Sequence, residues 1–146
     1  MGRSHALAYH RDPAFELVGL VNRSAPTLDP ALAGYEVTPD FQEALTRLKP
    51  DLVCVSTYSD SHADYAIAAM EAGAHVFVEK PLATTVADAR RVAERAARTG
   101  KKVVVGYILR HHPSWMRLIA EARSLGGPYV FRLNLNQQSS GATWEV

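Results

Sequence analysis

The chain has 146 residues, of which 47% are hydrophobic and 21% charged, and its formal net charge is +1. These ordinary globular values argue against a disordered chain, and the balanced charge gives no electrostatic case for a nucleic-acid or membrane partner. The single cysteine, Cys54, excludes a disulfide framework and is expected to be a small buried side chain. No apolar run reaches the length of a membrane span or forms a signal peptide, so we expect a soluble cytoplasmic protein.

Short apolar runs alternate with helical segments along most of the chain. N-cap residues and terminal glycines bound the helical segments, as Asp40, Ser61, Gly73, Thr85 and Gly100 do here. Runs that are apolar on both faces are typical of parallel strands covered by helices. The sequence therefore predicts an α/β fold with a doubly wound, parallel, Rossmann-type sheet. In chain order, the predicted elements are strand 15–22, helix 41–47, strand 51–57, helix 61–73, strand 75–80, helix 85–100 and strand 101–107.

The pattern changes after Tyr107. Residues 111–126 predict a further helix, and residues 129–138 alternate apolar and polar side chains, as in a strand with one solvated face. Such alternation is typical of an antiparallel sheet. We therefore expect a dinucleotide-binding domain over 1–108 and the beginning of a substrate domain over 109–146.

Polar residues follow the first predicted strand, where a dinucleotide fold meets the adenosine ribose. Asn22, Arg23 and Ser24 stand there, and none of them is an acid. An acid would bind the ribose diol of NAD, whereas a basic residue accommodates the 2′-phosphate of NADP. The position favours NADP over NAD, with Arg23 pairing with phosphate and Ser24 donating to it. The alternative is that Arg23 is a surface turn residue.

Small hydroxyl residues follow the second strand. Ser56 and Thr57 can face the phosphates or the ribose of a dinucleotide. The alternative is ordinary capping of the next helix by Ser59, Asp60 or Ser61. His62, one residue into that helix, faces either the cofactor or solvent.

The third strand ends in the tripeptide Glu79-Lys80-Pro81. A lysine at a strand end can exchange a proton with a substrate hydroxyl, and a neighbouring carboxylate and burial would tune it. Pro81 would fix the backbone that directs Lys80. The alternative is a surface turn with an incidental ion pair.

Residues 66–96, AIAAMEAGAHVFVEKPLATTVADARRVAERA, resemble the signature region of the Gfo/Idh/MocA family of glucose–fructose oxidoreductases and inositol dehydrogenases. The resemblance implies a Rossmann domain followed by an α/β substrate domain. It also implies NAD(P)-dependent oxidation or reduction of a sugar, polyol or related compound. By the same resemblance, Lys80 lies by the nicotinamide and the substrate hydroxyl, and Arg110 contacts cofactor or substrate.

The sequence departs from the family pattern at both ends. Gly2 matches the last glycine of the G-x-G-x-x-G turn, but no apolar strand or earlier glycine precedes it. That strand would be central, so its loss would leave both neighbours with open edges. The acid and histidine that assist Lys80 in the family would lie beyond Val146. We therefore expect a piece truncated at both ends and inactive alone, from a homo-oligomeric parent.

Two other interpretations remain open: a non-catalytic dinucleotide-binding or protein-interaction Rossmann module, and a purely structural α/β domain. No metal site is expected, because His111 and His112 lack further ligands at suitable spacing. The identity of the substrate cannot be predicted from this sequence.

Overall fold

A computed structural model describes residues 1–134. The chain divides after Tyr107 into two compact units, which are described separately. The first unit contains helices α1 (Gly2–Arg11), α2 (Phe41–Leu48), α3 (His62–Glu71) and α4 (Val86–Thr99), and strands β1 (Leu20–Val21), β2 (Val37–Thr38), β3 (Leu52–Val55), β4 (His75–Val78) and β5 (Val103–Val105).

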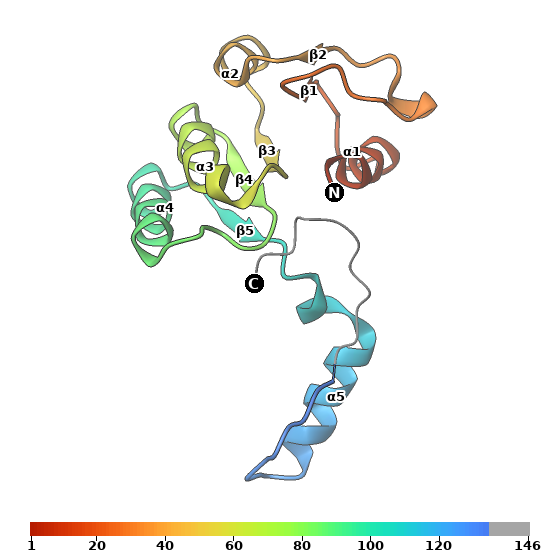
Figure 1. Cartoon of the computed structure of the whole chain (residues 1–146), viewed down its shortest axis with the longest axis vertical. Helices are drawn as coiled ribbons and strands as arrows, with labels where there is room; N and C mark the ends of the chain where they lie inside the picture. Colours follow the sequence, from red (N-terminus) through yellow and green to blue (C-terminus); the bar gives the residue numbers. More distant parts are fainter. Residues whose placement is uncertain (135–146) are drawn as a thin grey trace. The chain divides into compact units, whose positions relative to one another are not determined.

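All strand pairs in the first unit are parallel, and they form two sheets (Figure 1). One sheet has the order β3-β4-β5, and the other contains only β1 and β2. The prediction of a parallel Rossmann-type α/β fold is confirmed. Within residues 1–134, β1, β2, β3 and β5 each pair with a strand on one side only. The loss of a central strand between two of them stays a prediction.

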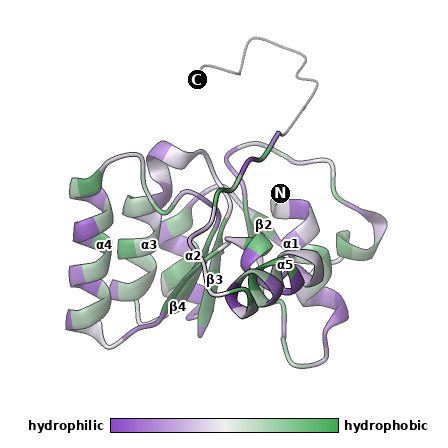
Figure 2. Ribbon diagram, turned by 90° about the horizontal axis from the view of Figure 1, so that it is seen from below, coloured by the Kyte–Doolittle hydropathy of each residue, from purple (hydrophilic) through white to green (hydrophobic). Residues whose placement is uncertain are grey.

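Helices cover both faces of the three-stranded sheet, with α3 and α4 on one side and α1 on the other (Figure 2). Because side chains alternate along a strand, neighbouring residues of β4 serve different faces. Val76 and Val78 are fully buried in the core formed with α3 and α4, together with Met70 and Val92. Phe77, between the two valines, instead contacts His5 of α1, with ring centroids 5.1 Å apart.

The boundaries of α2 and α4 follow the predicted terminal signals. Asp40 accepts hydrogen bonds from the N–H groups of Gln42 at 2.8 Å and Glu43 at 3.0 Å, and so begins α2. Thr85 caps α4 in the same way, through the N–H of Asp88 at 3.1 Å. Gly100 ends α4 with a φ of 67°, a left-handed conformation that glycine adopts without steric cost.

Several predicted elements are shorter than expected or wrong. Of the predicted strand 15–22, only Leu20–Val21 has a ladder partner, and that partner, β2, was not predicted. The strand predicted over 129–138 is wrong for residues 129–134, which form no strand because no neighbouring segment pairs with them. Residues 135–138 lie outside the described part of the chain.

The second unit begins at Ile108. It contains the 3₁₀-helix Ile108–His111 and helix α5 (Pro113–Ser124), which has Pro113 at its first position as expected. The expected assignment of 1–108 and 109–146 to two functional domains stays a prediction. No helix within residues 1–134 is long and apolar enough to cross a membrane.

Candidate functional site

The start of α1 lies against the carboxyl end of β3. A Cβ atom placed on Gly2 would come within 2.9 Å of the Ser56 hydroxyl oxygen. Glycine therefore lets the helix begin close to the residue that follows the strand. The structure thus brings together two predicted site residues, at a helix N-terminus whose free N–H groups suit a phosphate.

The next predicted residues, Thr57 and His62, are joined at the same end of β3. The Thr57 hydroxyl lies 2.8 Å from that of Ser61. Ser61 precedes α3 but makes no side-chain hydrogen bond that caps it, so the capping expected as the alternative to cofactor contact is not found there. The alternative that His62 faces solvent is wrong, because the side chain is buried, with Nδ1 2.7 Å from the Pro81 carbonyl oxygen and Nε2 3.1 Å from the Thr57 carbonyl oxygen. Both nitrogens of His62 therefore contact main-chain oxygens, and the ring links β3 to the turn after β4.

Glu79 and Lys80 point in different directions. Glu79 is only 6% exposed, and its Oε1 accepts a 2.7 Å hydrogen bond from Nε2 of His5, while its Oε2 accepts one from the Lys80 N–H at 3.1 Å. Burial raises the pKa of Glu79, but these hydrogen bonds and the charges of His5 and Lys80 outweigh it and hold the pKa below its usual value. Lys80 is exposed. The strand end thus presents an ammonium group beside a buried carboxylate.

His5 is a site residue that the sequence analysis missed. It stands one turn after Gly2, so a place near the strand ends could have been expected from the helical period. Its partner Glu79 is 74 residues away in the chain, and no local pattern specifies such a pairing.

The residues after β1 form a second cluster, with a pocket of about 400 Å³. Its walls come from the turn after β1 and from β2 and its end: Asn22, Arg23, Ser24, Ala25, Pro26, Val37 and Pro39. The Asn22 side-chain amide donates to the Ser24 carbonyl at 2.6 Å and shapes this turn. Arg23 and Ser24 are exposed in the pocket wall. No acidic side chain of the described residues lines the pocket.

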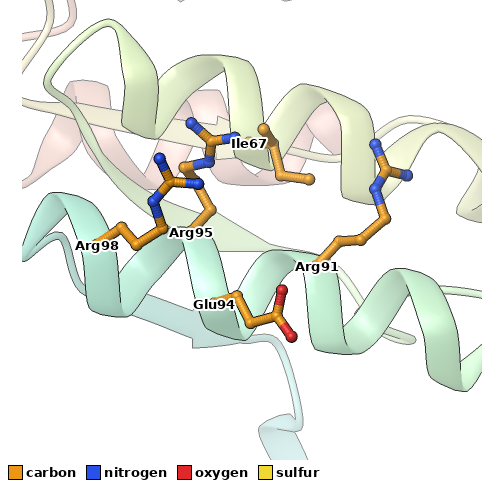
Figure 3. A pocket seen from close by; sticks show the side chains of 5 residues that line it. All are labelled: Ile67, Arg91, Glu94, Arg95 and Arg98. Carbon is orange, nitrogen blue, oxygen red and sulfur yellow. The ribbon is translucent and has the colours of Figure 1, made fainter.

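Two further features involve other elements. Arg110 belongs to the second unit, in the 3₁₀-helix Ile108–His111, and is exposed. A pocket of about 120 Å³ lies between α3 and α4 (Figure 3), lined by Ile67, Arg91, Glu94, Arg95 and Arg98. Arg91 pairs with Asp64 across the two helices, as Arg95 does with Glu71. These pairs make the second pocket part of the helix–helix contact.

The described residues offer little support for metal or thiol chemistry. No group of three or more potential metal ligands gathers within residues 1–134. Burial raises the pKa of the Cys54 thiol to about 11, and that of the neighbouring Tyr9 hydroxyl to about 12. A thiol with so high a pKa is a poor nucleophile near neutral pH.

The chain resembles known oxidoreductases. It is 36% identical to 4-carboxy-2-hydroxymuconate-6-semialdehyde dehydrogenase of Sphingobium sp. (strain NBRC 103272 / SYK-6) over 116 residues, 77% of this chain and 37% of that protein. It is 40% identical to inositol 2-dehydrogenase of Paracoccus denitrificans (strain Pd 1222) over 94 residues, 62% of this chain and 28% of that protein. The chain thus spans 28% to 37% of these relatives.

A solved structure of an oxidoreductase also resembles this chain. The WlbA dehydrogenase from Bordetella pertussis, in complex with NADH and UDP-GlcNAcA, matches 86% of this chain and 36% of its own with a TM-score of 0.72 and 25% sequence identity. Residues 1–107 match the family model described as an oxidoreductase family with an NAD-binding Rossmann fold, GFO_IDH_MocA. The parallel sheets, the glycine at the start of α1 and these matches show that the chain belongs to the Gfo/Idh/MocA oxidoreductase family.

Proposed function

We propose that this chain is the nucleotide-binding part of an NAD(P)-dependent oxidoreductase that acts on a CH–OH group of a sugar, polyol or related compound. The observation that supports this most directly is the setting of Lys80. Its exposed ammonium group follows a buried carboxylate, Glu79, which is bonded to the helix that begins at Gly2. An acid/base group and a phosphate-binding helix end therefore belong to one connected structure.

The chemistry asks little of the protein beyond proton transfer and positioning. A bound nicotinamide dinucleotide supplies the hydride acceptor or donor. Oxidation of a CH–OH group removes a hydride from carbon and a proton from oxygen, and leaves a C=O bond. Lys80 would accept the hydroxyl proton at Nζ in the oxidation and return it in the reverse reaction.

The first unit offers groups that fit a dinucleotide. The close approach of Gly2 to the Ser56 hydroxyl leaves no room for a side chain at position 2. The first N–H groups of α1 are proposed to bind the pyrophosphate at this helix end. Thr57 is exposed at the same strand end and is proposed to line the path of the cofactor. His62 is proposed to shape that path through its contacts with main-chain oxygens. Arg110, in the second unit, is proposed as a contact to cofactor or substrate.

Within the NAD-binding family, we propose that this member prefers NADP(H). Arg23 and Ser24 line the pocket after β1, and no acid stands there to bind a free ribose diol. A guanidinium and a hydroxyl suit a 2′-phosphate instead. The polyol class of substrate and homo-oligomeric assembly of the whole protein stay predictions. The former has the support of the similarity to an inositol 2-dehydrogenase.

A non-catalytic Rossmann module is the second candidate. Its support is the divided sheet, because β1 and β3 each have a pairing edge that no strand within residues 1–134 occupies. An edge of this kind can accept a strand from a partner. If the full-length protein binds the nucleotide tightly but transfers no hydride, this result would support the non-catalytic candidate.

The test has a binding arm and a turnover arm. Isothermal titration of the chain with NADP⁺ and NAD⁺ measures cofactor affinity. Turnover is measured in the full-length protein, from the nicotinamide absorbance with a panel of inositols and sugars. Lys80→Met should reduce turnover by at least about 100-fold, the usual contribution of a general acid/base, and leave NADP⁺ affinity within about threefold. Lys102→Met, at an exposed position before β5, is the matched control. Full turnover in Lys80→Met would refute the assigned role.

A further inference from the structure

His5 connects the first turn of α1 to the end of β4. Its Nε2 donates to Glu79 Oε1 at 2.7 Å, and the two side chains are 19% and 8% exposed. The imidazole also packs on Phe77, two residues earlier on the same strand. Because residues two apart in a strand share a face, one histidine contacts both Phe77 and Glu79. The contact therefore depends on the register of β4 and not on a flexible surface side chain.

Glu79 connects His5 to the main chain of Lys80. The Glu79 oxygen that does not contact His5 accepts the Lys80 N–H at 3.1 Å. A Cβ on Gly106 would come within 3.4 Å of that same oxygen, so the end of β5 closes the other side of the carboxylate. The titratable groups that face Glu79 are His5 of α1, the Cys54 thiol of β3 and Lys80 itself. Among them, only His5 belongs to the helix that begins at Gly2.

We propose that His5 is a positioning residue for Lys80: through Glu79 it fixes the main chain of Lys80 and couples it to the nucleotide-binding end of α1. The inference rests on the proposed function, which gives Lys80 proton transfer and gives α1 the phosphates. A nucleotide that binds at Gly2 would then alter the environment of Lys80 through a path of two hydrogen bonds, from His5 to Glu79 and from Glu79 to Lys80.

Three variants of His5 separate its hydrogen bond from its packing. His5→Phe keeps a ring on Phe77 but has no N–H donor, His5→Gln keeps a donor without the ring, and His5→Ala removes both. His10→Ala is the matched control, because His10 lies on the same helix and contacts a different partner, the Tyr35 hydroxyl, at 2.8 Å. The far-UV circular dichroism of each variant reports whether α1 and the rest of the fold remain.

The first readouts are the ¹³C titration of the Glu79 carboxyl and the hydrogen exchange of the Lys80 amide, both measured by NMR in the 146-residue chain. In His5→Phe and His5→Ala, the Glu79 midpoint should rise by about one pH unit, because a hydrogen bond to the charged form is lost. Lys80 amide exchange should accelerate about tenfold, the effect of losing one charged hydrogen bond. His5→Gln should restore part of both values, and His10→Ala should match the wild type. An unchanged Glu79 midpoint and unchanged Lys80 exchange in His5→Phe would overturn the proposal.

The second readout uses NADP⁺ and separates this inference from the proposed function. In the wild type, saturating NADP⁺ should shift the Lys80 amide signal. In His5→Phe, NADP⁺ should still bind, within about threefold of the wild-type affinity, with most of that shift lost. Retention of the full shift in His5→Phe would overturn the coupling. If the wild type binds neither NADP⁺ nor NAD⁺, the proposed function fails, and the titration and exchange then decide alone whether His5 sets the Lys80 main chain.

Discussion

His62 and Pro81 meet at 2.7 Å, so a buried imidazole of α3 contacts the carbonyl oxygen directly after Lys80. The same ring contacts the Thr57 carbonyl oxygen and thereby holds the ends of β3 and β4 together. His62 is thus both a part of the core and a support of the candidate site.

His62→Ala should lower the free energy of unfolding by about 2–4 kcal/mol, because it empties a fully buried position and removes the ring that contacts two main-chain oxygens. Urea denaturation followed by circular dichroism measures the loss. His111→Ala, at an exposed position in the second unit, should stay within about 0.5 kcal/mol of the wild type. A loss of unfolding free energy in His62→Ala as small as that in His111→Ala would contradict the structural role of His62.

Gly106→Ala should destabilise the chain by about 1–2 kcal/mol through overpacking. An added Cβ would lie 3.2 Å from the Phe77 ring, which is tighter than ordinary packing, and this ring is itself held against His5. Gly34→Ala is the matched control, since a Cβ there meets nothing within 4 Å. The control should be neutral or slightly stabilising, because alanine restricts the unfolded chain. Thermal melts of both variants check the difference, and equal melting temperatures would count against the close packing at Gly106.

Stability should fall as the pH rises from about 9 to 12. The folded pKa of Cys54 is raised to about 11 and that of Tyr9 to about 12, in both cases chiefly by burial. In the unfolded chain these groups lose their protons at lower pH, so there the unfolded state binds fewer protons and gains stability as the pH rises. Each group contributes a slope of at most about 1.4 kcal/mol per pH unit. Urea denaturation at pH 7, 9 and 10.5 measures the effect, and a flat profile would contradict the raised pKa values of Cys54 and Tyr9.

The same burial predicts slow reaction of Cys54 with iodoacetamide at pH 8. Full alkylation on the timescale of the urea-unfolded chain would contradict it. Cys54→Ser provides the blank for this measurement.

Arg23→Ala should weaken NADP⁺ binding by about tenfold or more and leave NAD⁺ binding within about twofold, because only NADP⁺ carries a 2′-phosphate to pair with a guanidinium. Isothermal titration of both nucleotides checks the selectivity. Arg90→Ala, an exposed position on α4, is the charge-matched control. If Arg23→Ala weakens the binding of NADP⁺ and NAD⁺ equally, Arg23 contacts a group that both nucleotides carry, and the proposed selectivity is wrong.

The sequence predicted the helices and the parallel strands of the first unit well, because local signals define them. Caps such as Asp40 and Thr85 act within three residues, and apolar runs mark strands buried on both faces. Strand β2 and the short β1 were harder to predict, because a strand of two residues exists only through its partner. The strand predicted over 129–138 failed for residues 129–134 for the same reason: alternation describes a pleated surface but does not supply a neighbour.

For the candidate site, the sequence indicated which residues bear chemistry but not how they pair. Glu79, Lys80 and Thr57 were expected at strand ends, and the structure places them there. The pairing of His5 with Glu79 and the contact of His62 with Pro81 depend on how α1 and α3 pack on the sheet. Long-range packing of this kind leaves no trace in local spacing.

Because side chains alternate at the end of β4, the order of Glu79 and Lys80 decides which of them faces α1. Phe77 and Glu79 share the face that meets α1, and Lys80 follows out of step with them. If Glu79 and Lys80 were exchanged in the sequence, the ammonium group would face His5 and the carboxylate would lie at the surface. The contact of Glu79 with α1 and the exposure of Lys80 thus depend on the order of these two residues after β4.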